Sequence, residues 1–198
     1  MKKFVCLLAC LFAFSANATL ITSISSGYTT HDFLSSGAKS GSIHESGITY
    51  SSTYSSSVYG YDGNYGFLRN GRWNNMNMIG LNTSFGTMTI EFDNAVSEVL
   101  AFVNYIDGWF GNAKMSVFDS NFNLLETNTL TFRTNKSNNS GFDLGFSSDT
   151  NEIKYIQFSD QYIGVHNLRT VQVPEPSAIL LLAFGLAGIG FSMKKKAT

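Results

Sequence analysis

The body of the chain is built from short stretches in which apolar and polar residues alternate. Residues 87–92 alternate strictly, and Met88, Ile90 and Phe92 fall on one face. Because strand side chains point alternately to opposite faces, this pattern predicts a strand with one buried face. Residues 97–106 are apolar on both faces, which predicts a central strand. Further strands are predicted at residues 47–54, 57–61, 113–118, 124–132, 142–146, 153–158 and 163–173.

Turn-forming residues separate these predicted strands at a spacing of roughly 8–12 residues. Gly, Asn, Asp and Ser fill the gaps, and no amphipathic helical stretch of useful length or fixed-period repeat stands out between them. A chain of this length suits one ordinary domain with extra segments at its ends. We therefore predict an all-β fold, a single antiparallel β-sandwich over residues 19–172.

Residues 1–18 have the pattern of a cleavable signal peptide. Lys2 and Lys3 form a positive start, and residues 4–14 form an apolar run that is too short for a comfortable membrane span. Small residues two positions apart follow, which is the pattern that signal peptidase cleaves. We predict export and a mature chain that starts at Thr19. The cleavage site is formed by Ala16, Ala18 and Thr19.

Two alternatives remain for the start of the chain. Residues 4–14 could form a buried core helix, and residues 7–10 loosely resemble a lipoprotein cleavage box that ends at Cys10. Cys6 and Cys10 are the only cysteines of the chain. If the signal peptide is removed, the mature protein can have neither a disulfide nor a thiolate metal site.

Residues 173–198 have the pattern of a membrane anchor. An apolar run covers residues 178–193, and three lysines follow it close to the end of the chain. The run is shorter than a comfortable span, but lysines can snorkel to the interface and extend its reach. Because positive charge stays cytoplasmic, the body is expected outside the inner membrane. The basic cluster consists of Lys194, Lys195 and Lys196.

Pro174, Glu175 and Pro176 precede this apolar run and distinguish the tail from an ordinary apolar segment. The order of Pro-Glu-Pro, short helix and terminal basic cluster resembles the PEP-CTERM sorting domain of Gram-negative bacteria. The resemblance implies processing by an exosortase near the motif, transient anchoring in the inner membrane, and a link to exopolysaccharide and biofilm. The lysines depart mildly from the arginines common in the family. The alternative is a plain C-terminal membrane anchor.

The body is more acidic than the chain as a whole. Charged residues make up 14% of the chain, and five of the 13 basic residues lie in the two end segments. The body keeps eight basic and 13 acidic residues, which gives it a net charge of −5. No basic stripe is left to follow a phosphate backbone, so we expect no nucleic-acid partner.

The second half of the body resembles jelly-roll, galactose-binding-like modules. It has a Val-Phe-Asp-x-Asn turn at residues 117–121 and an Ile-x-x-Ile-x-Phe strand at residues 153–158. Many PEP-CTERM bodies carry an Asp-Asn-Leu-like triplet just before the tail. The matching triplet here begins with His166 in place of the aspartate. If that aspartate serves a calcium site in relatives, the replacement puts the site in doubt.

The sequence contains no recognisable catalytic pattern. His31, His44 and His166 do not form a zinc-hydrolase spacing, and no Gly-x-Ser-x-Gly elbow occurs. Carboxylate pairs could hydrolyse glycosides. However, the candidate acids lie on a polar strand face or in turn-forming dipeptides, so we expect no enzyme activity. The two candidate pairs are Glu91 with Asp93 and Glu98 with Asp107.

Calcium is the cofactor that the residue types favour, although the chain is expected to need none. Asp62 and Asn64 enclose a glycine, and Asp119 and Asn121 enclose a serine. Asp and Asn oxygens suit Ca²⁺. Both segments are also ordinary turn sequences, and neither reproduces the EF-hand pattern.

Aromatic residues are the candidate ligand contacts. Trp109 and Phe110 lie between glycines in a predicted loop, where nothing obvious buries them. Exposed aromatic clusters mark binding sites, and aromatic rings stack on sugars. The alternative is a lid that folds back on the core. Other members of a sugar-stacking face could be Tyr59, Tyr61 and Trp73.

Together these features predict a non-catalytic, exported cell-surface or extracellular-matrix protein. It would be sorted by an exosortase and would contact exopolysaccharide. The alternatives are a secreted carbohydrate-active enzyme, which needs acids that converge in a cleft, and a purely structural matrix protein with no discrete site.

Overall fold

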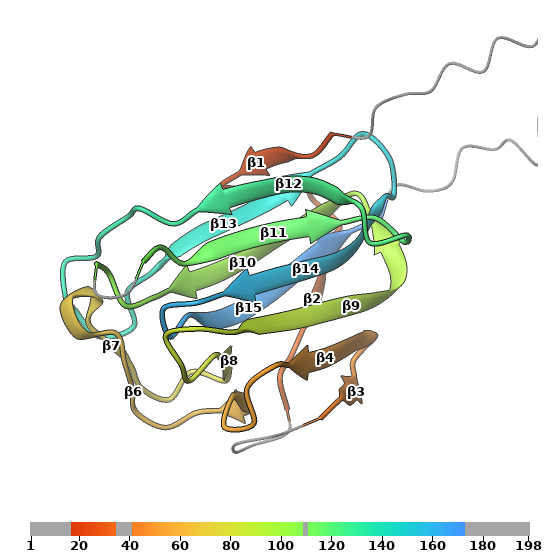
Figure 1. Ribbon diagram of the computed structural model, residues 1–198. Helices are drawn as coiled ribbons and strands as arrows, with labels where there is room; N and C mark the ends of the chain where they lie inside the picture. Colours follow the sequence, from red (N-terminus) through yellow and green to blue (C-terminus); the bar gives the residue numbers. More distant parts are fainter. Residues whose placement is uncertain (1–16, 35–40, 109–110, 173–198) are drawn as a thin grey trace, which may run out of the picture.

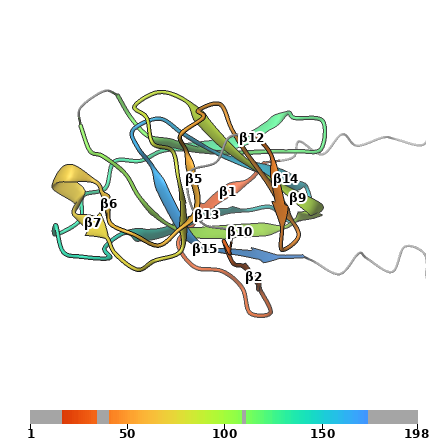
Figure 2. The same ribbon diagram turned by 90° about the horizontal axis from the view of Figure 1, so that it is seen from below.

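A computed structural model describes residues 17–34, 41–108 and 111–172, which form two β-sheets packed face to face (Figures 1 and 2). Every pairing between its named strands is antiparallel, and one short 3-10 turn, Leu68–Asn70, interrupts them. The predicted all-β, antiparallel class is therefore confirmed.

The larger sheet has seven strands in the order β1-β13-β10-β15-β8-β5, with β2 also paired to β15. The smaller sheet has six strands in the order β12-β11-β14-β9-β4-β3, and β6 and β7 form a separate hairpin. The strands of the larger sheet are β1 (Thr19–Ile21), β2 (Thr29–His31), β5 (Val58–Tyr61), β8 (Met78–Gly80), β10 (Glu98–Asn104), β13 (Phe142–Ser147) and β15 (Gly164–Val171). Those of the smaller sheet are β3 (Ile43–Glu45), β4 (Ile48–Ser52), β9 (Thr87–Val96), β11 (Lys114–Phe118), β12 (Leu124–Thr129) and β14 (Ile153–Ser159). The hairpin is formed by β6 (Tyr65–Gly66) and β7 (Arg72–Trp73).

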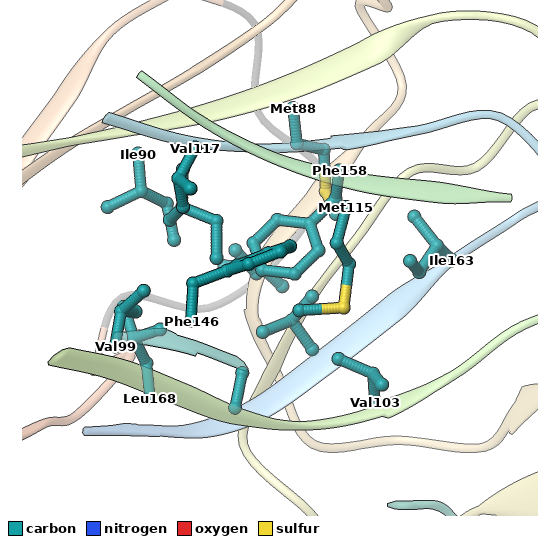
Figure 3. Packing of buried hydrophobic residues seen from close by; sticks show 14 of the residues in the cluster. Met88, Ile90, Val99, Val103, Met115, Val117, Phe146, Phe158, Ile163 and Leu168 are labelled. Carbon is teal, nitrogen blue, oxygen red and sulfur yellow. The ribbon is translucent and has the colours of Figure 1, made fainter. Parts of the chain in front are cut away.

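The main core lies between the two sheets, as alternation predicts. Met88 and Ile90 of β9 point inward from the smaller sheet. They face Val99 and Val103 of β10, which point into the same core from the larger sheet (Figure 3). Strand β10 is apolar on both faces because it contributes to two cores. Its Phe102 points to the outer face of the larger sheet, where a second cluster lies.

The second cluster covers the outer face of the larger sheet with residues from the 58–78 segment. Trp73 is its centre and is fully buried. Its ring stacks on Phe102 at a centroid distance of 5.6 Å and meets the edge of Phe67 at 4.9 Å. The Trp73 Nε1–H donates to the Ser140 carbonyl (2.6 Å), which fixes the β6–β7 hairpin against residues 133–141.

The sandwich has two different ends. At the tail end, the described chain begins and finishes, close to Thr19 and Val171. At the opposite end, which we call the loop end, β10 finishes at Asn104 and β13 begins at Phe142. Figures 1 and 2 place the β6–β7 hairpin at the loop end and the two chain ends at the tail end.

The predicted C-terminal membrane helix lies outside the described residues, as does most of the predicted signal peptide. Within the described ranges, no helix is long and apolar enough to cross a membrane.

Candidate functional site

Backbone hydrogen bonds fix both flanks of the loop that carries the predicted ligand contacts. Trp109 and Phe110 themselves lie outside the described residues. Before them, the Ile106 amide donates to the Gln161 carbonyl (2.9 Å); after them, the Leu130 amide donates to the Ala113 carbonyl (2.8 Å). The flanks of the loop are therefore tied to the ends of neighbouring strands.

Asp107 and Arg133 join this loop to residues 130–141. The Arg133 Nε lies 2.5 Å from Asp107 Oδ2, and the Asp107 side chain is 14% exposed while that of Arg133 is 70% exposed. Tyr105 adds a second link, because its hydroxyl donates to the Phe132 carbonyl (2.9 Å). Burial, with a smaller contribution from Asp107, raises the pKa of Tyr105 to about 12.

A surface hollow of about 480 Å³, which we call the Arg133 hollow, lies beside the link between Asp107 and Arg133. It is lined by Phe102, Arg133, Thr134, Asn135, Ser137, Asn139, Ser140, Gly141 and Phe142. Its lining combines hydroxyl and amide side chains with two aromatic rings, and Arg133 is the one charged residue among the described residues that line it. The Phe142 ring is 45% exposed and contacts Phe132 at a centroid distance of 4.6 Å. Such a volume is typical of small-ligand sites.

Two fully buried asparagines, Asn70 and Asn104, form hydrogen bonds with the loop that lines the Arg133 hollow. Asn70 accepts from the Thr134 hydroxyl through its carbonyl (2.7 Å) and from the Thr134 amide through Oδ1 (3.2 Å). Asn104 donates from Nδ2 to the carbonyls of Asn70 (2.9 Å) and Ser140 (3.0 Å). Because buried amides need partners, these bonds fix the course of the loop and make the hollow preformed.

Sequence reasoning missed the Arg133 hollow. Its one signal was the connection between β12 and β13, residues 130–141, which is long and rich in Asn, Ser and Thr. Long connections without secondary structure are often functional.

Two of the predicted stacking aromatics are wrong as surface contacts. Tyr59 lies in the main core and Trp73 in the second cluster, and both are fully buried. Tyr61 is partly buried at the edge of the second cluster. The polar neighbours of Trp73 in the sequence hid this burial, because the 72–78 segment shows no strand or helix period.

Of the two candidate carboxylate pairs, Glu98 and Asp107 lie too far apart for glycoside hydrolysis. Glu98 begins β10 and Asp107 lies beyond its other end, so the roughly 20 Å length of the strand separates them. Glycosidase pairs lie at most about 9.5 Å apart. Glu91 is paired with Lys154 at 3.2 Å, and Asp93 lies 3.7 Å from His44.

The three histidines each have their own hydrogen-bond partners in the fold. His31 is buried, and its ring joins β2 to β15 through Thr170 Oγ1 (2.8 Å). His44 is on the edge strand β3, where its Nδ1 lies 3.0 Å from Thr49 Oγ1. His166 Nδ1–H donates to the Asn77 carbonyl (2.7 Å), and Asn167 has a positive φ of 50° at an irregularity of the β10–β15 pairing. The His166 ring contacts Trp73 and Phe102, so this histidine has a packing role in the fold.

In both predicted calcium turns, oxygen atoms that could bind the ion accept hydrogen bonds from the protein. The Asp119 carboxylate accepts from the backbone amides of Asn121 (2.9 Å) and Asn123 (2.8 Å) and from Asn123 Nδ2 (2.8 Å). These hydrogen bonds, chiefly from Asn123, lower the pKa of Asp119. In the other turn, the carbonyl of Asp62 accepts from Asn75 and that of Asn64 from Tyr61. Within the described ranges, no three His, Cys, Asp or Glu side chains gather as metal ligands.

The predicted processing residues lie at the tail end or beyond it. Ala18 is buried against the main core, and Thr19 is the exposed first residue of β1. The other residues lie outside the described part of the chain; they are Ala16, Pro174, Glu175, Pro176, Lys194, Lys195 and Lys196.

Comparison with known families decides the nature of the tail. Residues 172–196 match the family model of the PEP-CTERM protein-sorting motif. The chain carries a PEP-CTERM sorting motif. The predicted resemblance is thereby confirmed over the last part of the chain. The motif implies an exported protein that is sorted by an exosortase and anchored in a membrane transiently before release.

No curated protein matches this PEP-CTERM chain significantly. Among solved structures, the body is similar to a fucose binding module of Streptococcus pneumoniae (TM-score 0.33, 12% identity, 48% of this chain and 70% of that one). It is also similar to a family 29 carbohydrate binding module complexed with mannohexaose (TM-score 0.37, 14% identity, 74% and 92%). A third similar structure is CsCBM6-3 from Clostridium stercorarium in complex with cellobiose (TM-score 0.34, 14% identity, 73% and 98%).

Proposed function

We propose that this chain is a non-catalytic surface or extracellular-matrix protein that contacts exopolysaccharide through its loop end. Signal peptidase removes residues 1–18, and the tail holds the body on the periplasmic side of the inner membrane. An exosortase then processes the tail at Pro174-Glu175-Pro176 and releases the body to the cell surface or matrix.

One observation carries the proposal: the Arg133 hollow and the sorting motif lie at opposite ends of the body. The hollow is lined from residues 133–142, at the loop end, and the motif begins at residue 172, one residue after β15 finishes at the tail end. A body anchored by its tail would therefore hold the hollow away from the membrane. The separation of Glu98 from Asp107 removes one of the two candidate catalytic pairs.

We also propose that the body belongs to the jelly-roll, galactose-binding-like class. In support of this, the chain changes sheets from β9 to β10 and again from β10 to β11. It changes sheets three more times from β12 through β15.

The test is a polysaccharide pull-down with the protein released from a host that has an exosortase and makes exopolysaccharide. We expect the released protein to co-purify with the polysaccharide. Trp109→Ala should weaken this association substantially while denaturant melts stay unchanged, because an exposed ring buries little area on folding. If the variant loses binding only in proportion to its unfolded fraction, Trp109 belongs to the core and not to the binding surface. Release without any association with polysaccharide would contradict the proposal and favour a purely structural protein.

A further inference from the structure

Two segments far apart in the sequence meet beside the Arg133 hollow. The turn at residues 69–72 packs against residues 136–139, and Gly71 approaches so closely that a Cβ there would lie 2.6 Å from the Ser137 carbonyl oxygen. The Arg72 carbonyl also accepts from the Asn139 amide (2.8 Å). The basic residues of these segments, with Arg133 three residues before Lys136, are Arg69, Arg72, Arg133 and Lys136.

These four residues are half of the basic residues of a body whose net charge is −5. In the described part of the chain, Arg69, Arg72 and Lys136 form no ion pair, and all three are exposed. The segments 69–72 and 133–141 contain no acidic residue, while Asp107, Asp143 and Asp160 lie elsewhere toward the loop end. Other acidic residues lie at the opposite, tail end, where strands β9 to β14 turn; they include Asp93, Glu98, Asp119, Asp149 and Glu152. The two packed segments therefore form a local basic pole on an acidic protein, and such a pole attracts anions.

Arg133 is the basic residue whose orientation is fixed. Its Nε side faces Asp107, which is nearly buried, while most of the side chain is exposed. A guanidinium has five N–H donors, so one such contact leaves its terminal amino groups for a second anion. Because Asp107 already restrains the side chain, binding costs less rotamer entropy than it would for a free arginine.

We infer that the Arg133 hollow binds an acidic glycan, with a sugar carboxylate at Arg133 and the sugar ring against Phe142. This inference rests on the proposed function and names its ligand class. Carboxylates pair with guanidinium groups through parallel N–H···O bonds. The hydroxyl and amide groups of the lining match ring hydroxyls, and the exposed face of Phe142 suits the apolar face of a sugar. Arg69, Arg72 and Lys136 attract the neighbouring acidic residues of the same polymer.

A nucleic acid is the other polyanion that a basic pole can attract. The lining favours the glycan, because its groups outside Arg133 are neutral hydroxyls, amides and two phenyl rings that suit a hydroxylated ring. Four basic residues are also few for tracking a phosphate backbone, where phosphate contacts dominate affinity.

The experiment compares an acidic polymer with its neutral ester and with duplex DNA as a second polyanion. The full chain, purified in detergent, is titrated with polygalacturonate, with the same polymer after methyl esterification, and with duplex DNA. We expect binding to polygalacturonate that falls about tenfold or more on esterification and weakens as salt is added.

Matched variants locate the site. Arg69→Gln with Arg72→Gln removes two exposed charges beside the hollow, and we expect polygalacturonate binding to fall about tenfold. Lys114→Gln removes an exposed charge on the other sheet and should leave binding unchanged. Arg133→Lys keeps the charge but loses the forked geometry, so it should weaken binding without loss of fold. Denaturant melts of each variant show whether it is folded.

The outcomes separate the inference from the proposed function. Equal binding of the esterified polymer, or equal loss with Lys114→Gln, would overturn the acidic-glycan inference while leaving glycan binding in place. Tighter binding of DNA than of polygalacturonate would overturn it in favour of a nucleic-acid site. Failure to bind any polysaccharide, acidic or neutral, would remove the proposed function as well.

Discussion

Thr19 and Val171 lie on one transverse row of the larger sheet. Thr19 pairs with Ser147 on β13, Ser147 with Glu98 on β10, and Glu98 with Val171 on β15. Neighbouring strands lie about 4.8 Å apart, so three spacings separate the two residues by about 14 Å. The first strand after the predicted cleavage site and the last strand before the sorting motif therefore reach the same end of the body, with β13 and β10 between them.

The first prediction concerns the mature start of the chain. We expect exported protein to begin at Thr19, because the small residues Ala16 and Ala18 fit signal peptidase and Thr19 already begins β1. N-terminal sequencing of exported material measures this directly. A lipid-modified start at Cys10 would show that the chain is a lipoprotein instead.

The second prediction concerns the tail. Replacing Pro174-Glu175-Pro176 with Ala-Gln-Ala should leave membrane insertion intact but stop release, because the exosortase would lose its motif while the apolar run remains. Fractionation of membrane and released protein measures the effect. Changing Lys194, Lys195 and Lys196 to arginine is the matched control, since charge is kept, and release should be normal. Normal release of the Ala-Gln-Ala variant would favour a plain anchor.

The third prediction concerns Trp73. Trp73→Ala should lower the free energy of unfolding by about 3–5 kcal/mol, because a fully buried aromatic ring is lost. Trp73→Phe should cost less, since the ring packing on Phe102 is partly kept and the Nε1 bond to Ser140 is lost. Denaturant melts measure both. If the alanine variant keeps its stability but fails to bind polysaccharide, Trp73 is a surface contact with the ligand and not a core residue.

The fourth prediction concerns alkaline pH. Burial raises the pKa of Tyr105 to about 12, above the value of about 10 in an unfolded chain. The unfolded chain thus releases this proton first, so the stabilisation is complete below about pH 10 and is lost as pH rises toward 12. Burial also raises the pKa values of Tyr50, Tyr59 and Tyr65, so they add to the loss.

Urea melts between pH 8 and pH 11.5, roughly spanning that range, measure this loss. Tyr105→Phe should reduce the steepness of the decline in unfolding free energy. Tyr54→Phe changes an exposed tyrosine and is the control. An unfolding free energy that stays level above pH 10 would contradict the assigned burial of these phenols.

The fifth prediction concerns calcium. We expect a chelator to leave the melting temperature of the protein unchanged, because the carboxylate of Asp119 is already occupied by amides of its own turn. A chelator-dependent fall in melting temperature would show that a calcium site exists. Asp119→Asn and Asp62→Asn would then distinguish the two turns.

The strands that the sequence predicted well are those whose hydrophobic pattern matches the cores that they contact. Met88, Ile90 and Phe92 point inward because one face of β9 meets the main core and the other meets solvent. Residues 97–106 read as a central strand because β10 has a core on each face. In such strands, the hydrophobic period and the environment agree.

The missed features depend on contacts between distant segments. Asn70 looks like an ordinary turn residue and Asn104 like a polar residue within a strand. The loop to which they bond comes 64 residues after Asn70 and 36 residues after Asn104. Short strands such as β1 and β2 carry no period long enough to detect, since they exist by pairing with β13 and β15. Local sequence carries no signal of such partners.

The position of β15 sets the order of events during export. The last strand of the body to be synthesised lies inside the larger sheet, between β10 on one side and β2 and β8 on the other. Until Gly164–Val171 has crossed the membrane, β5 and β8 have no attachment to β10, and β2 has no partner. Pairings this distant in sequence form late. The larger sheet can therefore close only once its last strand, which directly precedes the sorting motif, is available.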